Sequence, residues 1–427
     1  MKRLLVTLLI VVAVLVAAFG LAIAFGGPGE PSPMSSINDP FKNVDFSDLP
    51  ERSHFTARDG TKVAFRAYPA VGDAINGSVV LVHGSSASSS SMHVMAKAFA
   101  AAGYAAYALD MRGHGQSGVK GHIAYIGQLE DDMEDFIQST KVAQPSTLVG
   151  FSSGGGFVLR FAGSARQRLF SNYLLLTPFI SQDAATSRPS SGGWATVGVP
   201  RIIAISFLDG FGVHAFNDLP VIKFALDEEA KGFLTPQYSF ALAQNFRPER
   251  DYQANIRAVR QPLRVLAGQN DEVFYADKLA NVFKTAGKDV PITLLPGIDH
   301  ISLTLDSAAI QAAIAAVESM DHERPNHGRR IFDSYRSHDG PAERVYGRFA
   351  AHHFRWAAGW DDLHDPSACA RRFHRPERLE RSGLAHVHVI GESMSALFRD
   401  LRYSASERTD LRAGESARID SFGGNMG

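Results

Sequence analysis

One serine, one aspartate and one histidine occupy places in the chain where together they would carry out acyl transfer. Ser152 lies in GFSSG, residues 150–154, which fits the pattern G-x-S-x-G between an apolar run and a helix-like run. Small flanking residues permit the sharp strand-to-helix turn that exposes a serine oxygen. Ser152 is therefore the candidate nucleophile. The alternative is a glycine-rich turn whose serine only caps the helix.

A serine alcohol is a weak nucleophile unless an adjacent base removes its proton. On this type of sheet the expected order along the chain is serine, then acid, then histidine. Asp271 follows the apolar run PLRVLAG, and His300 follows the apolar run PITLLPG. We predict Asp271 as the acid and His300 as the base. Glu272 and Asp277 compete with Asp271 for the acid role.

A tetrahedral intermediate also needs backbone N–H donors for its oxyanion. The amide of Ser153, directly after the nucleophile, is predicted to supply one. The turn after VVLVHG is predicted to supply the other, from Ser85, with Ser86 as the second choice. His83 and Gly84 are interpreted as residues that shape this turn.

Elements that would position these residues alternate along the chain from about residue 52 to 320. Their alternation predicts an α/β fold with a mostly parallel central sheet flanked by helices. An antiparallel hairpin is expected at the edge of the sheet, from 53–60 and 61–70. The predicted parallel strands are 78–84, 105–110, 146–152, 172–178, 262–268 and 291–297, and the clearest helices are 92–103, 129–142, 153–165 and 307–320.

One interval, about 181–258, breaks this alternation. It holds no convincing strand but seven prominent aromatic residues: Trp194, Phe207, Phe211, Phe216, Phe224, Phe233 and Phe240. A structureless loop of that length is uncommon inside a compact domain. We predict an inserted helical cap subdomain, whose aromatic side chains either line an acyl-chain pocket or form the core of the cap itself.

Taken together, LVHGSS, YALDMRGHGQSG, GFSSGG, GQNDEV and GIDHISL resemble the α/β-hydrolase superfamily. The stretch from 107 to 118, followed by KGHIAYIGQLEDDMEDFI, resembles its lysophospholipase and monoacylglycerol-lipase-like group of S33-type serine hydrolases. The resemblance covers about 52–320. It implies an acyl hydrolase with no metal and no cofactor, and with a cap over the site. Asp110, Arg112, His114 and Gly115 match a loop that we interpret as architectural.

The resemblance and the candidate residues favour a serine hydrolase of carboxylic esters. Acylglycerols, lysophospholipids and similar small-molecule or lipid esters are the expected substrates. An amide or peptide hydrolase of the S33 type is one alternative, and acyl transfer to peroxide by the same three residues is another. A non-catalytic, membrane-tethered binding protein on the same fold is the alternative from a different class, because fold alone does not prove function.

The first residues carry a location signal. Lys2 and Arg3 precede the uncharged stretch Leu4–Phe25, whose 22 residues exceed the roughly 20 that span a bilayer. We interpret 1–27 as a transmembrane anchor and 28–51 as a linker. The positive flank predicts a catalytic domain on the extracytoplasmic side of a bacterial inner membrane. A signal peptide cleaved near Ala22-Ile23-Ala24, with secretion, is the alternative.

Composition narrows the classes of partner. The net charge of -1 gives no general attraction to nucleic acid. The single cysteine, Cys369, excludes an intramolecular disulfide and a cysteine-based zinc site. Residues 321–427 contain no lysine and many arginines and histidines, and we predict a largely disordered extension there. The oligomeric state is left open.

Overall fold

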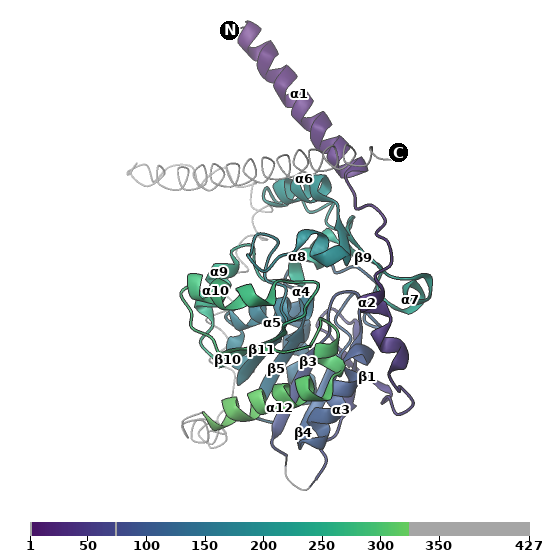
Figure 1. Ribbon diagram of the computed structural model, residues 1–427. Helices are drawn as coiled ribbons and strands as arrows, with labels where there is room; N and C mark the ends of the chain where they lie inside the picture. The colour runs from purple at the N-terminus through teal and green to yellow at the C-terminus, as the bar shows by residue number, and fades with distance from the viewer. Residues whose placement is uncertain (1, 73–74, 324–427) are drawn as a thin grey trace, which may run out of the picture. The chain divides into compact units, whose positions relative to one another are not determined.

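The computed structural model describes residues 2–72 and 75–323. Within these residues the main sheet has eight strands, in the order β1-β2-β4-β3-β5-β6-β10-β11 (Figure 1). β1 and β2 form the predicted edge hairpin, β2 runs antiparallel to β4, and the remaining neighbours are parallel. The strands are β1 (Arg52–Thr56), β2 (Lys62–Tyr68), β3 (Gly77–Val82), β4 (Tyr104–Leu109), β5 (Ser146–Phe151), β6 (Asn172–Leu176), β10 (Leu263–Gly268) and β11 (Ile292–Leu295).

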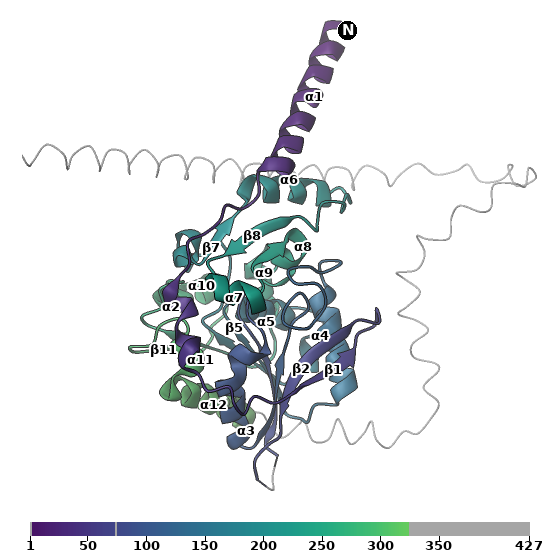
Figure 2. The same cartoon turned by 90° about the vertical axis from the view of Figure 1, so that its right-hand side faces the viewer.

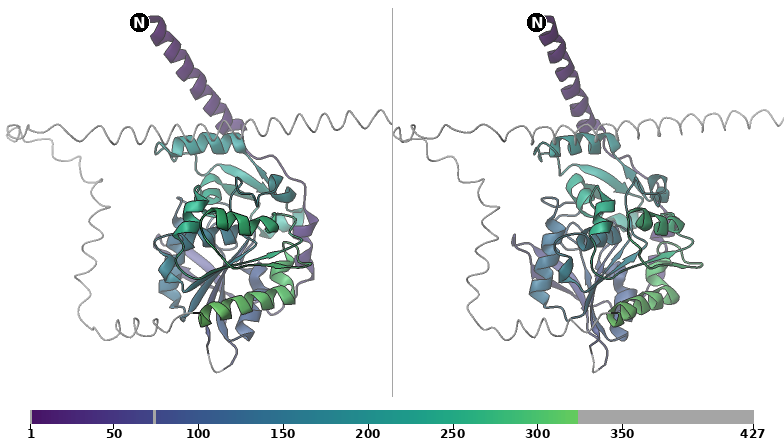
Figure 3. Two further views of the ribbon diagram at one scale, coloured as in Figure 1. Left: turned by 60° about the vertical axis from the view of Figure 1, so that its left-hand side comes forward. Right: turned by 90° about the vertical axis from the view of Figure 1, so that its left-hand side faces the viewer.

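Helices cover both faces of this sheet, as the alternating pattern predicts (Figure 3). α3 (His93–Ala101) connects β3 to β4, whereas α4 (Gln128–Thr140) and α5 (Ser153–Ala162) belong to crossovers that run in the opposite direction across the sheet. Right-handed crossovers therefore place α3 on one face and α4 with α5 on the other. α12 (Ser307–His322) packs beside α3. β3, β5 and β6 are buried along their whole length, which explains their continuous apolar sequences.

The sequence predicted a helical insertion at 181–258, and this prediction is wrong in part, because the insertion also contains strands. It contains a three-stranded antiparallel sheet of β7 (Ala195–Val197), β8 (Pro220–Phe224) and β9 (Gln237–Ser239). These strands are only three to five residues long, which is too short for an alternating pattern to be visible in the sequence. The helices of the insertion are α6 (Val199–Asp209), α7 (Glu228–Phe233), α8 (Phe240–Asn245) and α9 (Tyr252–Ala258).

The N-terminal apolar segment forms one helix, α1 (Lys2–Phe25), which is long and apolar enough to cross a membrane. Its last turns contact α6 of the insertion. The rings of Phe19 and Phe207 stack with their centroids 4.8 Å apart. Arg201 donates hydrogen bonds to the carbonyl oxygens of Ile23, at 2.8 Å, and Ala24, at 3.1 Å. Because the last carbonyls of a helix lack partners within the helix, Arg201 completes the end of α1.

Residues 26–38, which we call the strap, continue from α1 along the insertion (Figure 2). Glu30 forms an ion pair with Lys223 of β8 at 2.6 Å. The amide of Met34 donates to the carbonyl of Ala225 at 3.0 Å, and Ile37 is buried in the core. The strap ends in the short helix α2 (Ser35–Asn38). Much of the predicted linker thus has defined contacts. Of the predicted C-terminal extension, 321–427, the first two residues belong to α12, and 324–427 lie outside the described residues.

Candidate active site

Ser152 lies at a sharp turn between the end of β5 and the start of α5. Its backbone has φ 55° and ψ -121°, a conformation that is strained for a residue with a side chain. Glycines make the turn possible. A Cβ at Gly150 would lie 2.3 Å from the carbonyl oxygen of Gly154, and a Cβ at Gly154 would lie 2.3 Å from the carbonyl oxygen of His83. The spacing G-x-S-x-G therefore follows from the close approach of three backbone segments.

The structure brings the three predicted residues together in one hydrogen-bonded chain. His300 Nε2 lies 3.1 Å from Ser152 Oγ, and His300 Nδ1 lies 2.8 Å from Asp271 Oδ2. All three residues are buried. A carboxylate accepts but cannot donate, so Nδ1 carries the proton and Nε2 is the acceptor. The arrangement is one in which the imidazole can take the serine proton while the carboxylate stabilises the resulting cation.

Asp271 is held as a carboxylate by its surroundings. Burial alone would raise its pKa, but the charge of His300 and the hydrogen bonds that Asp271 accepts outweigh burial, so its pKa lies below the ordinary value. Oδ1 accepts the amides of Val273 and Phe274, both at 2.8 Å. Oδ2 accepts the hydroxyl of Thr177 as well as the imidazole. Thr177 is the residue of this site that the sequence analysis did not find.

The competing carboxylates lie elsewhere. Glu272 accepts the backbone N–H of His300 at 3.1 Å and does not hydrogen-bond to its ring. Asp277 is exposed and pairs with Lys278 at 2.8 Å. Asp299, beside the histidine, accepts the amide of Ser302 at 2.8 Å near the start of α11 (Ser302–Leu305). Among these carboxylates, Asp271 alone faces the imidazole.

The loop after β3, which carries Ser85, passes close to the serine turn. A Cβ at Gly84 would lie 3.3 Å from the Cβ of Ser152. Met111 donates its amide to His83 Nε2 at 3.2 Å, so His83 Nδ1 carries a proton, which it donates to the Gly84 carbonyl at 2.7 Å. In a trans peptide the C=O and N–H point in opposite directions. Fixing the Gly84 carbonyl therefore also fixes the direction of the Ser85 N–H.

The second predicted donor and the second-choice donor differ in what they contact. Ser153 is the first residue of α5, and the first amides of a helix have no partner within the helix. Its N–H therefore has no acceptor within α5, and its role as an oxyanion donor stays a prediction. Ser86, by contrast, donates its amide to the hydroxyl of Tyr238 at 2.7 Å. This contact favours Ser85 over Ser86 as the partner of Ser153.

The motif residues interpreted as architectural contact protein groups rather than open space. The carboxylate of Asp110 accepts the amides of Ser89, at 2.7 Å, and Gln116, at 3.0 Å. Arg112 forms two hydrogen bonds to Asp132 of α4, at 2.6 and 2.7 Å. These contacts join the loop after β4 to neighbouring elements, which agrees with the architectural interpretation.

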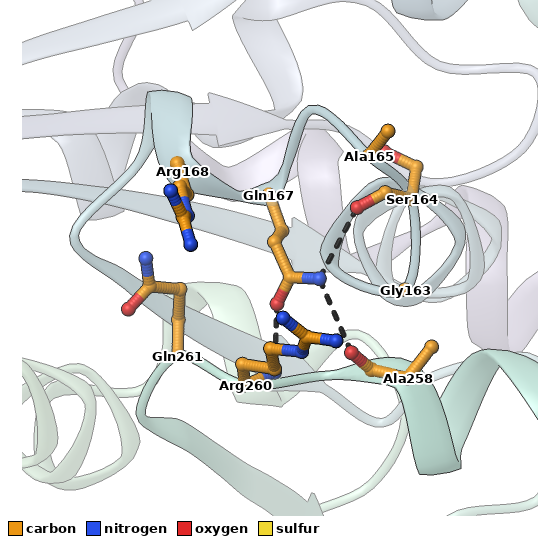
Figure 4. Close-up of a pocket in the computed structure, with 8 residues that line it drawn as sticks. All are labelled: Gly163, Ser164, Ala165, Gln167, Arg168, Ala258, Arg260 and Gln261. Atoms are coloured by element: carbon orange, nitrogen blue, oxygen red, sulfur yellow. Dashed lines mark hydrogen bonds between the residues drawn. The ribbon is translucent and has the colours of Figure 1, made fainter.

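A cavity of about 620 Å³ lies away from these residues, at the far end of α5 (Figure 4). Ser152 precedes the first residue of this ten-residue helix, so the cavity is separated from it by roughly 15 Å of helix. Its two arginine side chains are exposed. It contains none of the predicted site residues, and its lining consists of Gly163, Ser164, Ala165, Gln167, Arg168, Ala258, Arg260 and Gln261.

Comparisons with known proteins place this geometry in context. Residues 73–306 match the family described as serine aminopeptidase, S33. A monoacylglycerol lipase of Mycolicibacterium smegmatis is 28% identical over 240 residues, which cover 52% of this chain and 81% of that protein. A solved monoglyceride lipase of Saccharomyces cerevisiae aligns with a TM-score of 0.49 at 18% identity, covering 65% of this chain and 97% of that one. A monoacylglycerol lipase of Paleococcus ferrophilus aligns with a TM-score of 0.46 at 18% identity, covering 61% and 99%.

Proposed function

The chain belongs to the serine aminopeptidase S33 family of α/β hydrolases, and we propose that it is a serine hydrolase of carboxylic esters. The observation that carries this proposal is the buried chain of hydrogen bonds from Ser152 through His300 to Asp271. A serine hydroxyl, a neutral imidazole and an ionised carboxylate in this order are the components of acyl transfer through an acyl-enzyme.

In the proposed mechanism, Ser152 Oγ attacks the ester carbonyl carbon while His300 Nε2 takes the serine proton. The amides of Ser85 and Ser153 donate to the oxygen on which negative charge develops. His300 then gives its proton to the leaving alcohol, and the acyl group remains on Ser152. Water enters, loses a proton to His300, and releases the acid by the same sequence. Asp271 stays ionised throughout and orients the imidazole.

Lipid-like esters are the proposed substrate class. A relative that is 28% identical is named a monoacylglycerol lipase, and the chain carries an apolar helix that is long enough to span a bilayer. The aromatic residues of the insertion support this class only in part. Trp194, Phe224 and Phe240 are buried, whereas Phe211 and Phe233 are exposed. The buried ones form the core of the insertion, which we propose acts as a cap over the site.

A peptide substrate is less well supported. An enzyme that recognises a free amino terminus needs carboxylates directed at it, and the acidic group of the insertion is Asp227-Glu228-Glu229. Asp227 accepts the amide of Ala230 at 2.7 Å as the N-cap of α7. Glu228 is exposed and pairs with Lys231 at 2.7 Å. Two of these three carboxylates thus have local partners, and this favours an ester substrate over an amide substrate.

We propose that α1 anchors the protein in a bacterial inner membrane, with the catalytic residues on the periplasmic side. The positive residues Lys2 and Arg3 before the apolar stretch support this orientation. The contacts of Arg201 with the last carbonyls of α1 support an anchor that is retained in the folded protein. Mass spectrometry of the protein from the membrane fraction tests this. Peptides from residues 4–25 would exclude cleavage of the N-terminal segment as a signal peptide.

The direct test uses the full chain in detergent and p-nitrophenyl esters from acetyl to dodecanoyl. Ser152→Ala should lower kcat by about a million-fold, because loss of the nucleophile removes the whole acyl-transfer route. Ser164→Ala, at the opposite end of α5, is the matched control and should retain activity. A fluorophosphonate probe should label the wild-type chain and not Ser152→Ala.

Three outcomes would contradict the proposal in different ways. Ester hydrolysis that persists in Ser152→Ala would exclude Ser152 as the nucleophile. Labelling by the probe without hydrolysis of any ester would favour an amide substrate. A folded wild-type chain that neither hydrolyses esters nor reacts with the probe would favour a binding protein.

A further inference from the structure

The loop that carries Ser85 is held by the insertion as well as by the main sheet. Trp194, just before β7, donates its indole N–H to Ser85 Oγ at 2.8 Å. Trp194 is buried, whereas Ser85 is only partly buried. The hydrogen bond therefore connects a fixed side chain of the insertion to the residue whose amide is proposed to bind the oxyanion.

The next residue, Ser86, is held even more completely. Its Oγ donates to the Thr235 carbonyl at 2.7 Å, and its own carbonyl accepts the Thr235 amide at 2.9 Å. Its N–H donates to Tyr238 Oη at 2.7 Å. Ser86 has a φ of 70°, in the left-handed region that a serine rarely adopts. Such a conformation persists only where the surroundings impose it, and here they belong to the segment around β9.

The hydroxyl of Tyr238 has a defined direction. His114 Nδ1 faces the carbonyl oxygens of Met111 and Arg112, at 3.3 and 3.2 Å, so that nitrogen carries the proton. His114 Nε2 is then an acceptor, and Tyr238 Oη lies 2.5 Å from it. Tyr238 therefore donates to His114 and accepts from Ser86. The hydroxyl of Tyr238 therefore connects the loop after β3, which carries Ser85 and Ser86, to the loop after β4, which carries His114.

Trp194 and Tyr238 belong to one packed layer. The ring of Phe224, on β8, stacks on Trp194 with centroids 5.5 Å apart and packs edge-on against Tyr238 at 4.6 Å. All three side chains are buried. Closely packed buried side chains do not move independently. The indole N–H of Trp194 and the hydroxyl of Tyr238 therefore keep a fixed separation.

We propose that Trp194 and Tyr238 are positioning residues for the oxyanion donor Ser85, so that the sheet β7–β9 sets the rate of acyl transfer in addition to covering the site. This inference rests on the proposed function. It assigns the two residues a role through Ser85 and Ser86, with no contact to the reacting atoms. Loss of a complete oxyanion donor lowers kcat about 100- to 1000-fold. A donor that is present but displaced should cost less, about tenfold.

The decisive experiment is a double-mutant cycle in the full chain. Trp194→Phe keeps a ring to stack on Phe224 but removes the N–H. Ser85→Ala removes the hydroxyl that receives it but keeps the amide. Each should lower kcat about tenfold with little change in KM, and the double variant should lose no more than either single one, because both remove the same hydrogen bond. Additive losses would overturn the inference, since they would mean that Trp194 acts independently of Ser85.

A reversible trifluoromethyl ketone gives a readout that a purely structural role would not change. Ser152 adds to its carbonyl, His300 takes the serine proton, and the adduct places an anionic oxygen at the Ser85 and Ser153 amides. Its Ki should rise in Trp194→Phe and Tyr238→Phe by the same factor by which kcat/KM falls. Tyr125→Phe, which loses only a surface hydrogen bond to Asp131, is the control.

The outcomes separate this inference from the proposed function. An active wild-type chain with unchanged kcat and Ki in Trp194→Phe would overturn the inference and leave the serine hydrolase intact. A wild-type chain without esterase activity or fluorophosphonate labelling would overturn both. Ser85→Ala changes a partly buried hydroxyl, so it tests the same hydrogen bond if Trp194→Phe folds poorly.

Discussion

Thr177 contacts the same carboxylate oxygen that faces His300. It lies just beyond β6 with a φ of 39°, and its hydroxyl donates to Asp271 Oδ2. Thr177→Val should remove this hydrogen bond, lower kcat about tenfold through a less well oriented imidazole, and destabilise the fold by about 1.5–3 kcal/mol. Thr177→Ser keeps a hydroxyl and should therefore retain most of the kcat and most of the stability of the wild-type chain. Ester hydrolysis and urea unfolding in detergent measure the two effects.

The stability effect of Thr177→Val should depend on pH. Asp271 has a lowered pKa in the folded chain, so its contribution is present above the unfolded pKa of about 3.9 and is lost as pH falls through the folded pKa. The difference in unfolding free energy between wild type and Thr177→Val should therefore shrink below about pH 4. A difference that grows on acidification would show that the hydroxyl does not act on the carboxylate form.

At the residue scale, the sequence predicted those site residues whose roles depend on their order along the chain. Ser152 ends one predicted strand, Asp271 and His300 follow two later ones in the expected order, and the structure joins the three by hydrogen bonds. Thr177 could not be found in this way, because its role depends on β6 lying next to β10 in the sheet. The choice between Ser85 and Ser86 depends on Tyr238, 152 residues away from Ser86.

At the element scale, α4 is fixed to the sheet by buried charge. Asp132 on α4 and Arg112 are both about 7% exposed and lie 2.6 Å apart. Asp132→Ala would leave the guanidinium buried, with the more exposed Asp59 as its remaining partner at 2.9 Å. Loss of one member of a buried pair destabilises by about 3–5 kcal/mol, and we expect about 3 kcal/mol here because Asp59 remains.

Urea unfolding measures this loss, with Asp277→Ala as the matched control. Asp277 pairs with Lys278 at the surface, and removing an exposed pair should change the unfolding free energy by less than about 1 kcal/mol. Equal effects of the two substitutions would show that the buried pair contributes no more than an exposed one.

The elements themselves were largely predictable. The parallel strands were visible as apolar runs bounded by glycine or proline because they are buried on both faces, and β3 and β5 show this over their full length. The strands of the insertion were not visible. β7 and β9 are three residues each, and they become strands only by pairing with β8, whose residues lie well apart from them in the chain.

At the scale of the whole molecule, the apolar surface of α1 continues onto the insertion. Val199, Phe207, Phe211 and Val213 are between 42% and 63% exposed, on or just after the helix that contacts α1. We expect this face to lie in the lipid interface. In a Cys369→Ser full chain reconstituted in vesicles, an environment-sensitive dye on Phe211→Cys should shift its emission to the blue, because it enters a less polar medium.

The control for this prediction is the same dye on Val71→Cys. Val71 is also exposed, but it lies in the loop before β3. This loop is at the amino ends of the parallel strands, whereas Ser152 is at their carboxyl ends. Since the face is apolar and the net charge is -1, vesicles of neutral and of anionic lipid should give the same shift. Emission from the 211 position equal to that from the 71 position would show that α6 stays in water.

The sequence predicted the N-terminal apolar segment at this scale but not the docking of the strap. Nothing in the composition of residues 26–38 shows that Glu30 meets Lys223 or that Met34 meets Ala225. These contacts join parts of the chain that are far apart in sequence, so they follow from the folded insertion and not from any local pattern.

The docked strap has a consequence for how the protein is made. Glu30 and the lysine that it contacts are 193 positions apart, so the strap is synthesised well before the surface that it binds. At a synthesis rate of roughly 5–20 residues per second, the strap waits about 10–40 s for its binding surface to exist. During that interval its apolar side chains, Ile37 among them, have no place to pack. The strap can therefore close only after the insertion has been synthesised and has folded.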